Sequence, residues 1–211
     1  MALLSKELES YLDQHCDPET DLLKHINRET HLKVLMPRML SGHYQGRVLS
    51  MLSKLIRPRR ILEIGTYTGY ATLCLAEGLA VDGIIHTIDV NQELEEMVRE
   101  SFSKSAFEAK INCHLGNALT IIPTLDEVFD LVFIDADKRN NANYYHLVLD
   151  KMSSGGVIIV DNVLWSGKVL SDATDKDTLG IQQFNALVQA DTRVEKLMLP
   201  VRDGLLIVRK K

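Results

Sequence analysis

ILEIGTYTGY, residues 61–70, is the stretch that decides the fold. It begins with a short run of apolar and β-branched residues, which is typical of a buried strand. Gly65 and Gly69 then allow the backbone to turn sharply and to approach a ligand closely. A helical pattern follows over Thr72–Leu79. The stretch therefore predicts a strand, a tight turn and a helix, the unit from which parallel α/β sheets are built.

The same rhythm continues downstream, with further helix-like stretches over Glu93–Ser105 and Asn143–Met152. Near the end, Val194–Leu199 and Leu205–Val208 flank Arg202-Asp203-Gly204, a turn that predicts an antiparallel hairpin. We therefore expect an α/β fold with a mostly parallel, seven-stranded sheet that ends in this hairpin. The remaining expected strands are Ile61–Ile64, Ile84–Ile88, Ile111–His114, Leu131–Ile134 and Val157–Val160.

The first part of the chain, residues 1–57, is expected to be a helical extension that packs on a core of residues 58–211. Asp17-Pro18-Glu19 is typical of a helix start, with aspartate as the N-cap and proline in the first turn. The apolar stripe over Val48–Ile56 predicts another helix before Pro58. His31–Gly46 has no clean period and is interpreted as a loop crossing the surface.

Composition indicates one globular domain of 211 residues, with 45% hydrophobic and 25% charged residues. The formal charge of -5 weighs against a broad electrostatic grip on nucleic acid. The first residues lack the apolar core of a signal peptide, and no apolar run reaches the ~20 residues of a membrane span. Cys16, Cys74 and Cys113 show no paired spacing and are expected to be reduced thiols. We therefore expect a cytoplasmic protein without membrane association.

The glycine loop has the spacing G-x-x-x-G over Gly65–Gly69. A dinucleotide pyrophosphate is normally seated by G-x-G-x-x-G, so the spacing counts against NAD or FAD. Asp89 ends the second strand, where a carboxylate can accept hydrogen bonds from ribose hydroxyls. Both NAD and S-adenosylmethionine sites use such an acid. Together the loop and Asp89 predict a nucleoside ligand.

Oxygen ligands follow two neighbouring strands of the expected sheet. Asp135 ends one strand, and Asp161 and Asn162 end the next. Parallel strands end at the same edge of a sheet, so these side chains are expected to converge beside the glycine loop. Two carboxylates and an amide oxygen suit Mg²⁺, Mn²⁺ or Ca²⁺, whereas zinc would favour Cys and His. Lys138, three residues after Asp135, is the candidate general base.

These motifs resemble the cation-dependent O-methyltransferases, the group that contains caffeoyl-CoA and catechol O-methyltransferase. The resemblance covers roughly residues 35–211 and implies a Rossmann-like class I methyltransferase fold that acts as a homodimer. It further implies S-adenosylmethionine as methyl donor and a catechol-like, phenolic small molecule as acceptor. The matching segments are LEIGTYTGYATLCLAEGL (62–79), TIDVN (87–91), FIDADKRNNANYY (133–145), VDNVLWSGKV (160–169) and LPVRDGLLIVRK (199–210).

The resemblance also implies a role for individual residues. Asp135, Asp161 and Asn162 would bind the cation, with Lys138 as the base that contacts the substrate and Trp165 beside the acceptor. Ala71 departs from the family, which often has a donor-binding serine there. The donor would be contacted by Leu40, Ser41, Glu63, Gly65, Tyr67, Asp89, Gly116, Ala118 and Asp135, with Glu63, Gly65 and Tyr67 at its methionine end, Asp89 on the ribose and residues 116–118 along the adenine.

Three other functions are compatible with the sequence. The first is methylation of a hydroxylated uridine in tRNA, which some relatives of the family perform. The second is an NAD-dependent oxidoreductase, and the third is a binding module without catalysis. The loops His31–Gly46 and Ser166–Thr178 would shape the acceptor pocket but carry no motif that identifies the acceptor. A tRNA would need a basic patch, for which the candidates are Arg38, Arg47, Arg57, Arg59 and Arg60.

Overall fold

The computed structural model describes residues 5–172 and 175–211. The first four residues of the expected extension, and two residues of the expected loop Ser166–Thr178, therefore lie outside the described residues. The described chain contains a seven-stranded sheet in the order β3-β2-β1-β4-β5-β7-β6. Its strands are β1 (Arg60–Ile64), β2 (Ile84–Asp89), β3 (Ile111–Leu115), β4 (Phe129–Ile134), β5 (Met152–Asp161), β6 (Val194–Leu199) and β7 (Leu205–Lys210).

The strands β1 to β5 pair in parallel, whereas β7 runs antiparallel to both β5 and β6. The expected mostly parallel sheet with a final hairpin is therefore confirmed. The strand order reverses between β1 and β4, with β2 and β3 on one side and β5 on the other. In open α/β sheets the crevice at this switch point is where ligands bind.

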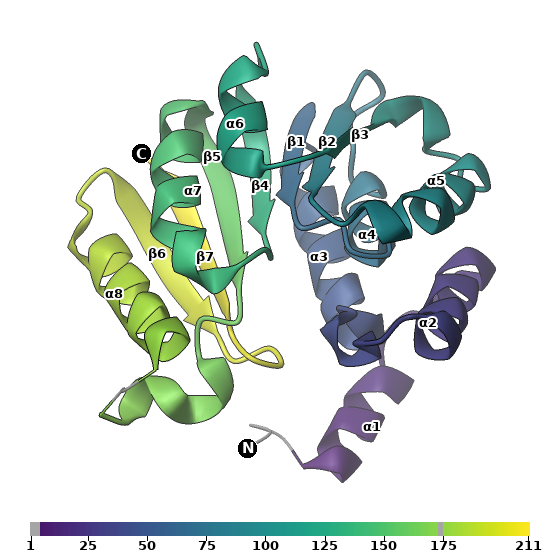
Figure 1. Ribbon diagram of the computed structural model, residues 1–211, viewed down its shortest axis with the longest axis horizontal. Coiled ribbons are helices and arrows are strands. Elements are labelled where there is room, and N and C mark those ends of the chain that lie inside the picture. The colour runs from purple at the N-terminus through teal and green to yellow at the C-terminus, as the bar shows by residue number, and fades with distance from the viewer. Residues whose placement is uncertain (1–4, 173–174) are drawn as a thin grey trace.

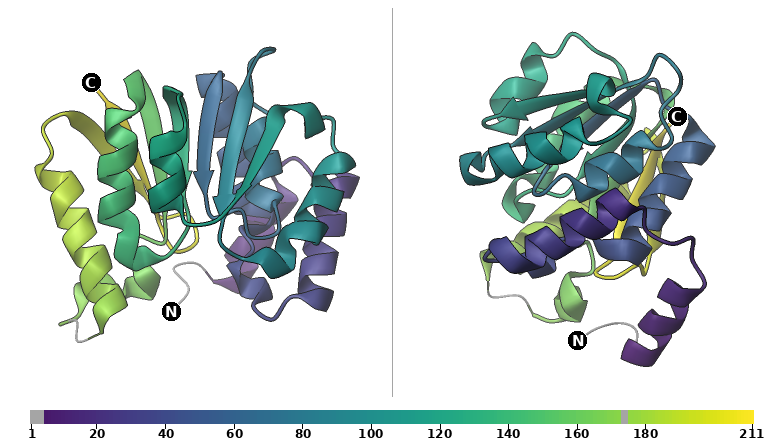
Figure 2. Two further views of the ribbon diagram at one scale, coloured as in Figure 1. Left: turned by 45° about the horizontal axis from the view of Figure 1, so that its top comes forward. Right: turned by 90° about the vertical axis from the view of Figure 1, so that its right-hand side faces the viewer.

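Helices cover both faces of the sheet (Figures 1 and 2). Alternating side chains of each strand point to opposite faces, so Ile61 packs with the first helical layer and Leu62 with the second. The apolar runs are explained by this burial on two sides. The first layer contains α3 (Gly42–Ile56), α4 (Tyr70–Ala76) and α5 (Glu95–Ser103), and the second contains α6 (Ala118–Ile121), α7 (Asn141–Asp150) and α8 (Lys176–Ala190).

Two helices precede these layers: α1 (Lys6–Gln14) and α2 (Asp21–Lys33). The expected helix start at Asp17-Pro18-Glu19 is wrong by a few residues, because Thr20 is the N-cap and its hydroxyl accepts a hydrogen bond from the Leu23 amide. Short 3-10 turns complete the chain at Pro37–Met39, Gln92–Leu94, Glu108–Lys110, Ile122–Thr124, Lys138–Asn140 and Trp165–Leu170.

The interpretation of His31–Gly46 as a surface loop is wrong. Its first residues belong to α2, its last residues begin α3, and Leu40 and Ser41 are buried between them. Gly42 hides the helical period of the apolar residues in this stretch. It is the first residue of α3 and does not interrupt a helix. The expected loop Ser166–Thr178 likewise extends too far, since α8 begins at Lys176. No helix within the described ranges is long and apolar enough to cross a membrane.

Candidate active site

The carboxyl ends of β1 and β4 touch through their backbones. The Asp135 amide donates to the Ile64 carbonyl at 2.9 Å. Gly65 adopts φ +105, and a Cβ at this position would lie 2.3 Å from the Asp135 carbonyl oxygen. A side chain at position 65 would therefore push the two strand ends apart, so glycine is required here on both conformational and steric grounds.

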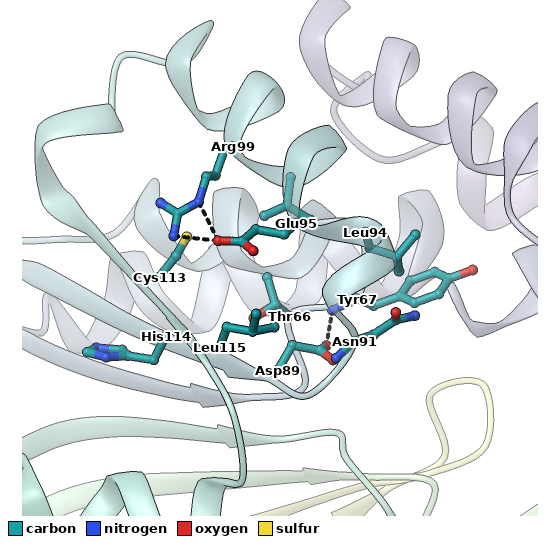
Figure 3. A pocket seen from close by; sticks show the side chains of 11 residues that line it. Thr66, Tyr67, Asp89, Asn91, Leu94, Glu95, Arg99, Cys113, His114 and Leu115 are labelled. Atoms are coloured by element: carbon teal, nitrogen blue, oxygen red, sulfur yellow. Dashed lines mark hydrogen bonds and ion pairs between the residues drawn. The ribbon is translucent and has the colours of Figure 1, made fainter.

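Asp89 organises the loop beside this contact (Figure 3). One carboxylate oxygen accepts a hydrogen bond from the Tyr67 backbone amide at 2.7 Å, and the other accepts one from the Asn91 backbone amide at 2.9 Å. Tyr67 itself has φ 50, a left-handed conformation that is uncommon outside glycine. The Gly116 amide donates to the Asp89 carbonyl at 2.8 Å, which brings the end of β3 to the same edge. The acid expected on the ribose thus also holds the glycine loop in place.

Glu63 lies beneath the glycine loop and is fully buried. One of its carboxylate oxygens accepts hydrogen bonds from the hydroxyls of Thr72 and Thr87, the latter at 2.6 Å. The other oxygen, Oε1, is buried and has no hydrogen-bond partner within the described part of the chain. Burial raises the pKa of Glu63 to about 8, although both threonine hydrogen bonds act in the opposite direction. Glu63 is therefore mostly protonated at neutral pH.

Lys138 and Asp137 have different partners although they are adjacent in the sequence. The Lys138 ammonium donates to Asp135 Oδ1 at 2.8 Å, and both side chains are largely shielded from solvent. Asp137 caps the following turn by accepting the Asn140 amide at 3.2 Å, and it also accepts the Tyr144 hydroxyl at 2.7 Å. Lys138 therefore faces the strand ends, whereas Asp137 holds the chain that presents it.

Asp161 ends β5 and is almost fully buried. Its Oδ2 accepts the side-chain amide of Gln45 at 2.7 Å, and its Oδ1 accepts the Asn162 amide at 2.6 Å. Burial raises the pKa of Asp161, and the nearby charge of Asp135 raises it further, while Lys138 acts against both. Asn162 follows at φ 63, a left-handed conformation that asparagine tolerates. The two expected carboxylates thus interact with each other.

Gln45 is the residue of this cluster that the sequence interpretation missed. It lies on α3, one helical turn before the buried Leu49, and it is itself 1% exposed. Extending the apolar stripe of Val48–Ile56 upstream by four residues reaches this position, where a polar side chain occurs on a buried helix face. That mismatch is a signal, because buried polar groups need a partner. Its partner, Asp161, is 116 residues away.

The donor set of this cluster consists of oxygen atoms, which divalent cations such as Mg²⁺ prefer. In the described ranges, no three carboxylate, imidazole or thiol side chains form a group that could hold a metal ion. The expected set has two carboxylates, Asp135 and Asp161, and the amide of Asn162 as its third member. Asp161 is buried and Asp135 is partly exposed. A hard cation, which accepts oxygen ligands, stabilises two such carboxylates that repel each other. The donor set therefore fits a cation that completes its coordination with water or substrate oxygens.

The remaining expected residues lie around the same edge or on the loops that follow it. Ala118 is buried behind Asn117, whose side chain caps α6 by accepting the Leu119 amide at 2.9 Å. Trp165 is partly exposed and has φ 48. Leu40 and Ser41 are buried, and their carbonyl oxygens accept hydrogen bonds from Arg202.

Residues 13–211 match the model of a protein family described as O-methyltransferase. Caffeoyl-CoA O-methyltransferase 1 of Arabidopsis thaliana is 37% identical over 188 residues, which cover 82% of this chain and 71% of the plant protein. This chain belongs to the O-methyltransferase family. The predicted resemblance to caffeoyl-CoA O-methyltransferases is thereby confirmed, and the chain is an S-adenosylmethionine-dependent O-methyltransferase.

Solved structures of O-methyltransferases agree with this assignment. The O-methyltransferase TomG from Streptomyces achromogenes, in complex with SAM, has a TM-score of 0.89 and 28% identity, and the match covers 97% of this chain and 96% of that chain. An O-methyltransferase from Bacillus cereus in complex with SAH has a TM-score of 0.90 and 29% identity, with 97% of each chain covered. The expected Rossmann-like class I methyltransferase fold is confirmed.

Family membership decides between the alternatives. The chain is an S-adenosylmethionine-dependent O-methyltransferase. The alternatives of an NAD-dependent oxidoreductase and of a binding module without catalysis are therefore wrong. The tRNA alternative is not supported. Of the arginines considered for a basic patch, Arg47 pairs with Glu77 at 2.7 Å and Arg60 with Glu127 at 2.8 Å. Arg59 pairs with Asp82. These carboxylates neutralise the positive charges of the three arginines, which binding of a tRNA phosphate backbone would require.

Proposed function

We propose that this O-methyltransferase transfers a methyl group to one hydroxyl of a catechol-like small molecule with the help of a divalent cation. Asp135, Asp161 and Asn162 are the proposed ligands, and Mg²⁺ is the preferred cation, with Mn²⁺ or Ca²⁺ as alternatives. The proposal rests on one observation: Ile134 and Val160 are partners in the parallel pairing of β4 with β5, so Asp135 and Asp161 follow at neighbouring strand ends. The charge of Asp135 accordingly raises the pKa of the buried Asp161. They lie beside the glycine loop, since Gly65 touches the Asp135 backbone.

The proposed acceptor class is supported by what the relatives methylate by name. The caffeoyl group in the name of the Arabidopsis relative carries two adjacent phenolic hydroxyls. Two carboxylates and one amide would leave some coordination positions of a divalent cation free. The two vicinal oxygens of the acceptor suit those free positions. We propose that Trp165 and Lys138 contact this acceptor. The donor would lie along Leu40, Ser41, Glu63, Gly65, Tyr67, Asp89, Gly116, Ala118 and Asp135.

The proposed chemistry is an in-line displacement. An acceptor oxygen attacks the methyl carbon, the carbon–sulfur bond breaks, and its electron pair stays on sulfur. Lys138 acts as a neutral amine, after its ammonium has passed one proton to solvent water, and its Nζ then accepts the hydroxyl proton. A bound divalent cation would supply positive charge that favours the phenolate and aligns the two oxygens. A positioned base contributes about 10²–10⁴-fold, and alignment of the reactants contributes more.

The cation proposal is tested with labelled S-adenosylmethionine and a simple catechol, with Mg²⁺ or with EDTA. Turnover is expected to stop in EDTA and to return when Mg²⁺ is added. Asp161→Ala is expected to lower Mg²⁺-dependent turnover by at least about 100-fold, because it removes one of the two proposed carboxylate ligands. Its donor affinity, measured by calorimetry, should remain. Asp82→Ala is the matched control, since Asp82 pairs with Arg59 on the surface. Full activity of Asp161→Ala would refute the ligand assignment.

The ribose proposal is tested separately. Asp89→Ala is expected to weaken donor binding by about 10–100-fold, because hydrogen bonds to a charged group contribute roughly 1.5–3 kcal/mol. The Mg²⁺ concentration that gives half-maximal activity should change much less. Asp89→Asn keeps the shape of the side chain and should lie between the wild type and Asp89→Ala. Unchanged donor affinity in both variants would remove Asp89 from the ribose site.

The homodimer and the cytoplasmic location stay predictions. The homodimer is supported only by the resemblance to the family. Light scattering coupled to size exclusion measures its mass directly, and a mass of 23.8 kDa would contradict the dimer.

A further inference from the structure

The segment Met36–Ser41 crosses the ends of the central strands. Tyr67, in the loop after β1, donates its hydroxyl to the Met36 carbonyl at 2.9 Å. Arg202, in the turn before β7, donates to the Leu40 carbonyl at 2.6 Å and to the Ser41 carbonyl. In the sheet order, β4 and β5 lie between β1 and β7. The segment therefore passes the strand ends that carry Asp135 and Asp161, and it is anchored on both sides of them.

Among the residues that the structure describes, the Arg202 guanidinium donates hydrogen bonds to backbone oxygens alone. Besides Leu40 and Ser41, its guanidinium donates to the Arg38 carbonyl at 3.4 Å. Within the described ranges it forms no ion pair with a carboxylate. Its backbone adopts φ 48, which is uncommon for a long side chain. Such a conformation persists where surrounding contacts determine it, and here the three carbonyls are those contacts.

The same turn is bonded on its other side to the loop that follows Asn162. The Asp203 carbonyl accepts the Leu164 amide at 2.9 Å, and the Asp203 carboxylate accepts the Ser166 amide. Gly204 has φ +90, and a Cβ there would lie 2.5 Å from Leu164 Cγ. The turn thus packs directly against residues on both sides of Trp165. Two neighbouring side chains, one cationic and one anionic, hold two segments that are far apart in the sequence.

We propose that Arg202 is a positioning residue for the methyl donor and that Asp203 is its counterpart for the acceptor. Arg202 holds Leu40 and Ser41, and Asp203 holds the loop of Trp165, so one hairpin turn determines how far apart the two substrates lie. The inference rests on the proposed function, in which Leu40 and Ser41 contact the donor and Trp165 the acceptor. Methyl transfer depends steeply on that separation, because the reacting atoms must approach in line.

The test compares Arg202→Met with Asp203→Ala, using the full chain with Mg²⁺, S-adenosylmethionine and a simple catechol. Arg202→Met is expected to raise the donor Kd and KM by about 10-fold, since it removes charge-assisted hydrogen bonds to the segment. The acceptor KM should stay within about twofold, because the two contacts are separate. Asp203→Ala is expected to give the opposite split, with a raised acceptor KM and an unchanged donor Kd.

Two further variants distinguish positioning from folding. Arg202→Lys keeps a cation and should bind the donor nearly as tightly as the wild type. If the role of Arg202 were purely structural, Arg202→Lys and Arg202→Met would lose donor affinity alike. Arg209→Met is the matched control, because Arg209 lies on the neighbouring strand and pairs with the exposed Glu195 at 3.0 Å. It should bind donor and acceptor like the wild type.

The inference and the proposed function fail in distinguishable ways. A normal donor Kd in Arg202→Met, beside a wild type that binds S-adenosylmethionine, would overturn the inference alone. Parallel rises of both KM values in Arg202→Met and Asp203→Ala would also overturn it, because they indicate a general loss of structure. A wild type that is active without any divalent cation would overturn the cation proposal and leave the roles of Arg202 and Asp203 standing if the split is found. A wild type that binds no donor would overturn both.

Discussion

Glu63 is a buried acid that the fold keeps protonated. Its pKa is raised from the ordinary value of 4.5 to about 8, chiefly by burial. The unfolded chain releases this proton near the ordinary value, whereas the folded chain retains it up to about pH 8. The folded state therefore binds more protons than the unfolded state in this range, and the free energy of unfolding falls as pH rises. The contribution of Glu63 is complete below the ordinary pKa and is lost above the raised one.

Glu63→Gln is expected to remove this pH dependence. Glutamine stays uncharged, and its side-chain oxygen can still accept the hydroxyls of Thr72 and Thr87. The wild type should lose thermal stability relative to Glu63→Gln as pH rises from about 5 to about 8. The measurement is the Tm of both proteins across that pH range without ligands. Two parallel curves of Tm against pH would contradict the prediction.

At the scale of single elements, two helical glycines have opposite surroundings. A Cβ on Gly46 of α3 would lie 2.7 Å from Tyr70 Cε1 and 2.9 Å from Cys74 Sγ, both on the buried helix α4. A Cβ on Gly180 of α8 would meet its nearest neighbour, the Lys138 carbonyl oxygen, at 3.7 Å. Only the first glycine is therefore required for two helices to approach each other.

Alanine at these two positions should change stability in opposite directions. Gly46→Ala is expected to destabilise the protein by roughly 1–3 kcal/mol, the usual range for an overpacked core. Gly180→Ala is expected to stabilise it by about 0.5–1 kcal/mol, because alanine is the better helix former and the methyl group finds ordinary contact. Urea unfolding at fixed pH measures both differences. Equal effects of the two substitutions would show that the α3–α4 contact is not decisive.

Single elements also show where prediction from sequence works. The strand Ile61–Ile64 and the hairpin strands were placed to within about two residues, because apolar runs and turn residues are local signals. The start of α3 was missed. Its first turn contains Gly42 and the polar residues His43 and Gln45, which break the apolar period although the helix is buried there. The local pattern can mark Gln45 as a polar residue on a buried helix face, but it cannot identify the partner on another element.

At the scale of the whole molecule, α1 contributes little to the body of the protein. Its apolar side chains Leu8 and Tyr11 are 45% and 57% exposed. The helix lies at the periphery of the molecule, below α2 and α3 in the view of Figure 1 (see also Figure 2). In contrast, α2 and α3 bury Leu23, Ile26 and Leu49 in the core with the first helical layer. We therefore expect the helical extension 1–57 to contain one dispensable helix and two that complete the fold.

Removal of residues 1–14 is expected to lower Tm by no more than about 3 °C, since 1 kcal/mol corresponds to roughly 2–4 °C for a chain of this size. The matched comparison removes residues 1–57. This variant loses Gln45 and the buried residues of α2 and α3, and it should not unfold in a single cooperative transition. Circular dichroism during heating measures both. A large loss of Tm in the shorter truncation would mean that α1 is covered in solution.

The sequence by itself determined the parallel sheet, the glycine loop and the edge at which Asp89, Asp135 and Asp161 lie. Strands alternating with helices leave all carboxyl ends at one edge, so residues that end strands meet there whatever the details of packing. Only the tertiary structure decided that Gln45 donates a hydrogen bond to Asp161, 116 residues away. The same holds for the hydrogen bonds from Arg202 to the carbonyls of Leu40 and Ser41, 162 and 161 residues away. Such hydrogen bonds depend on where whole elements pack, and no periodicity within either segment encodes its distant partner.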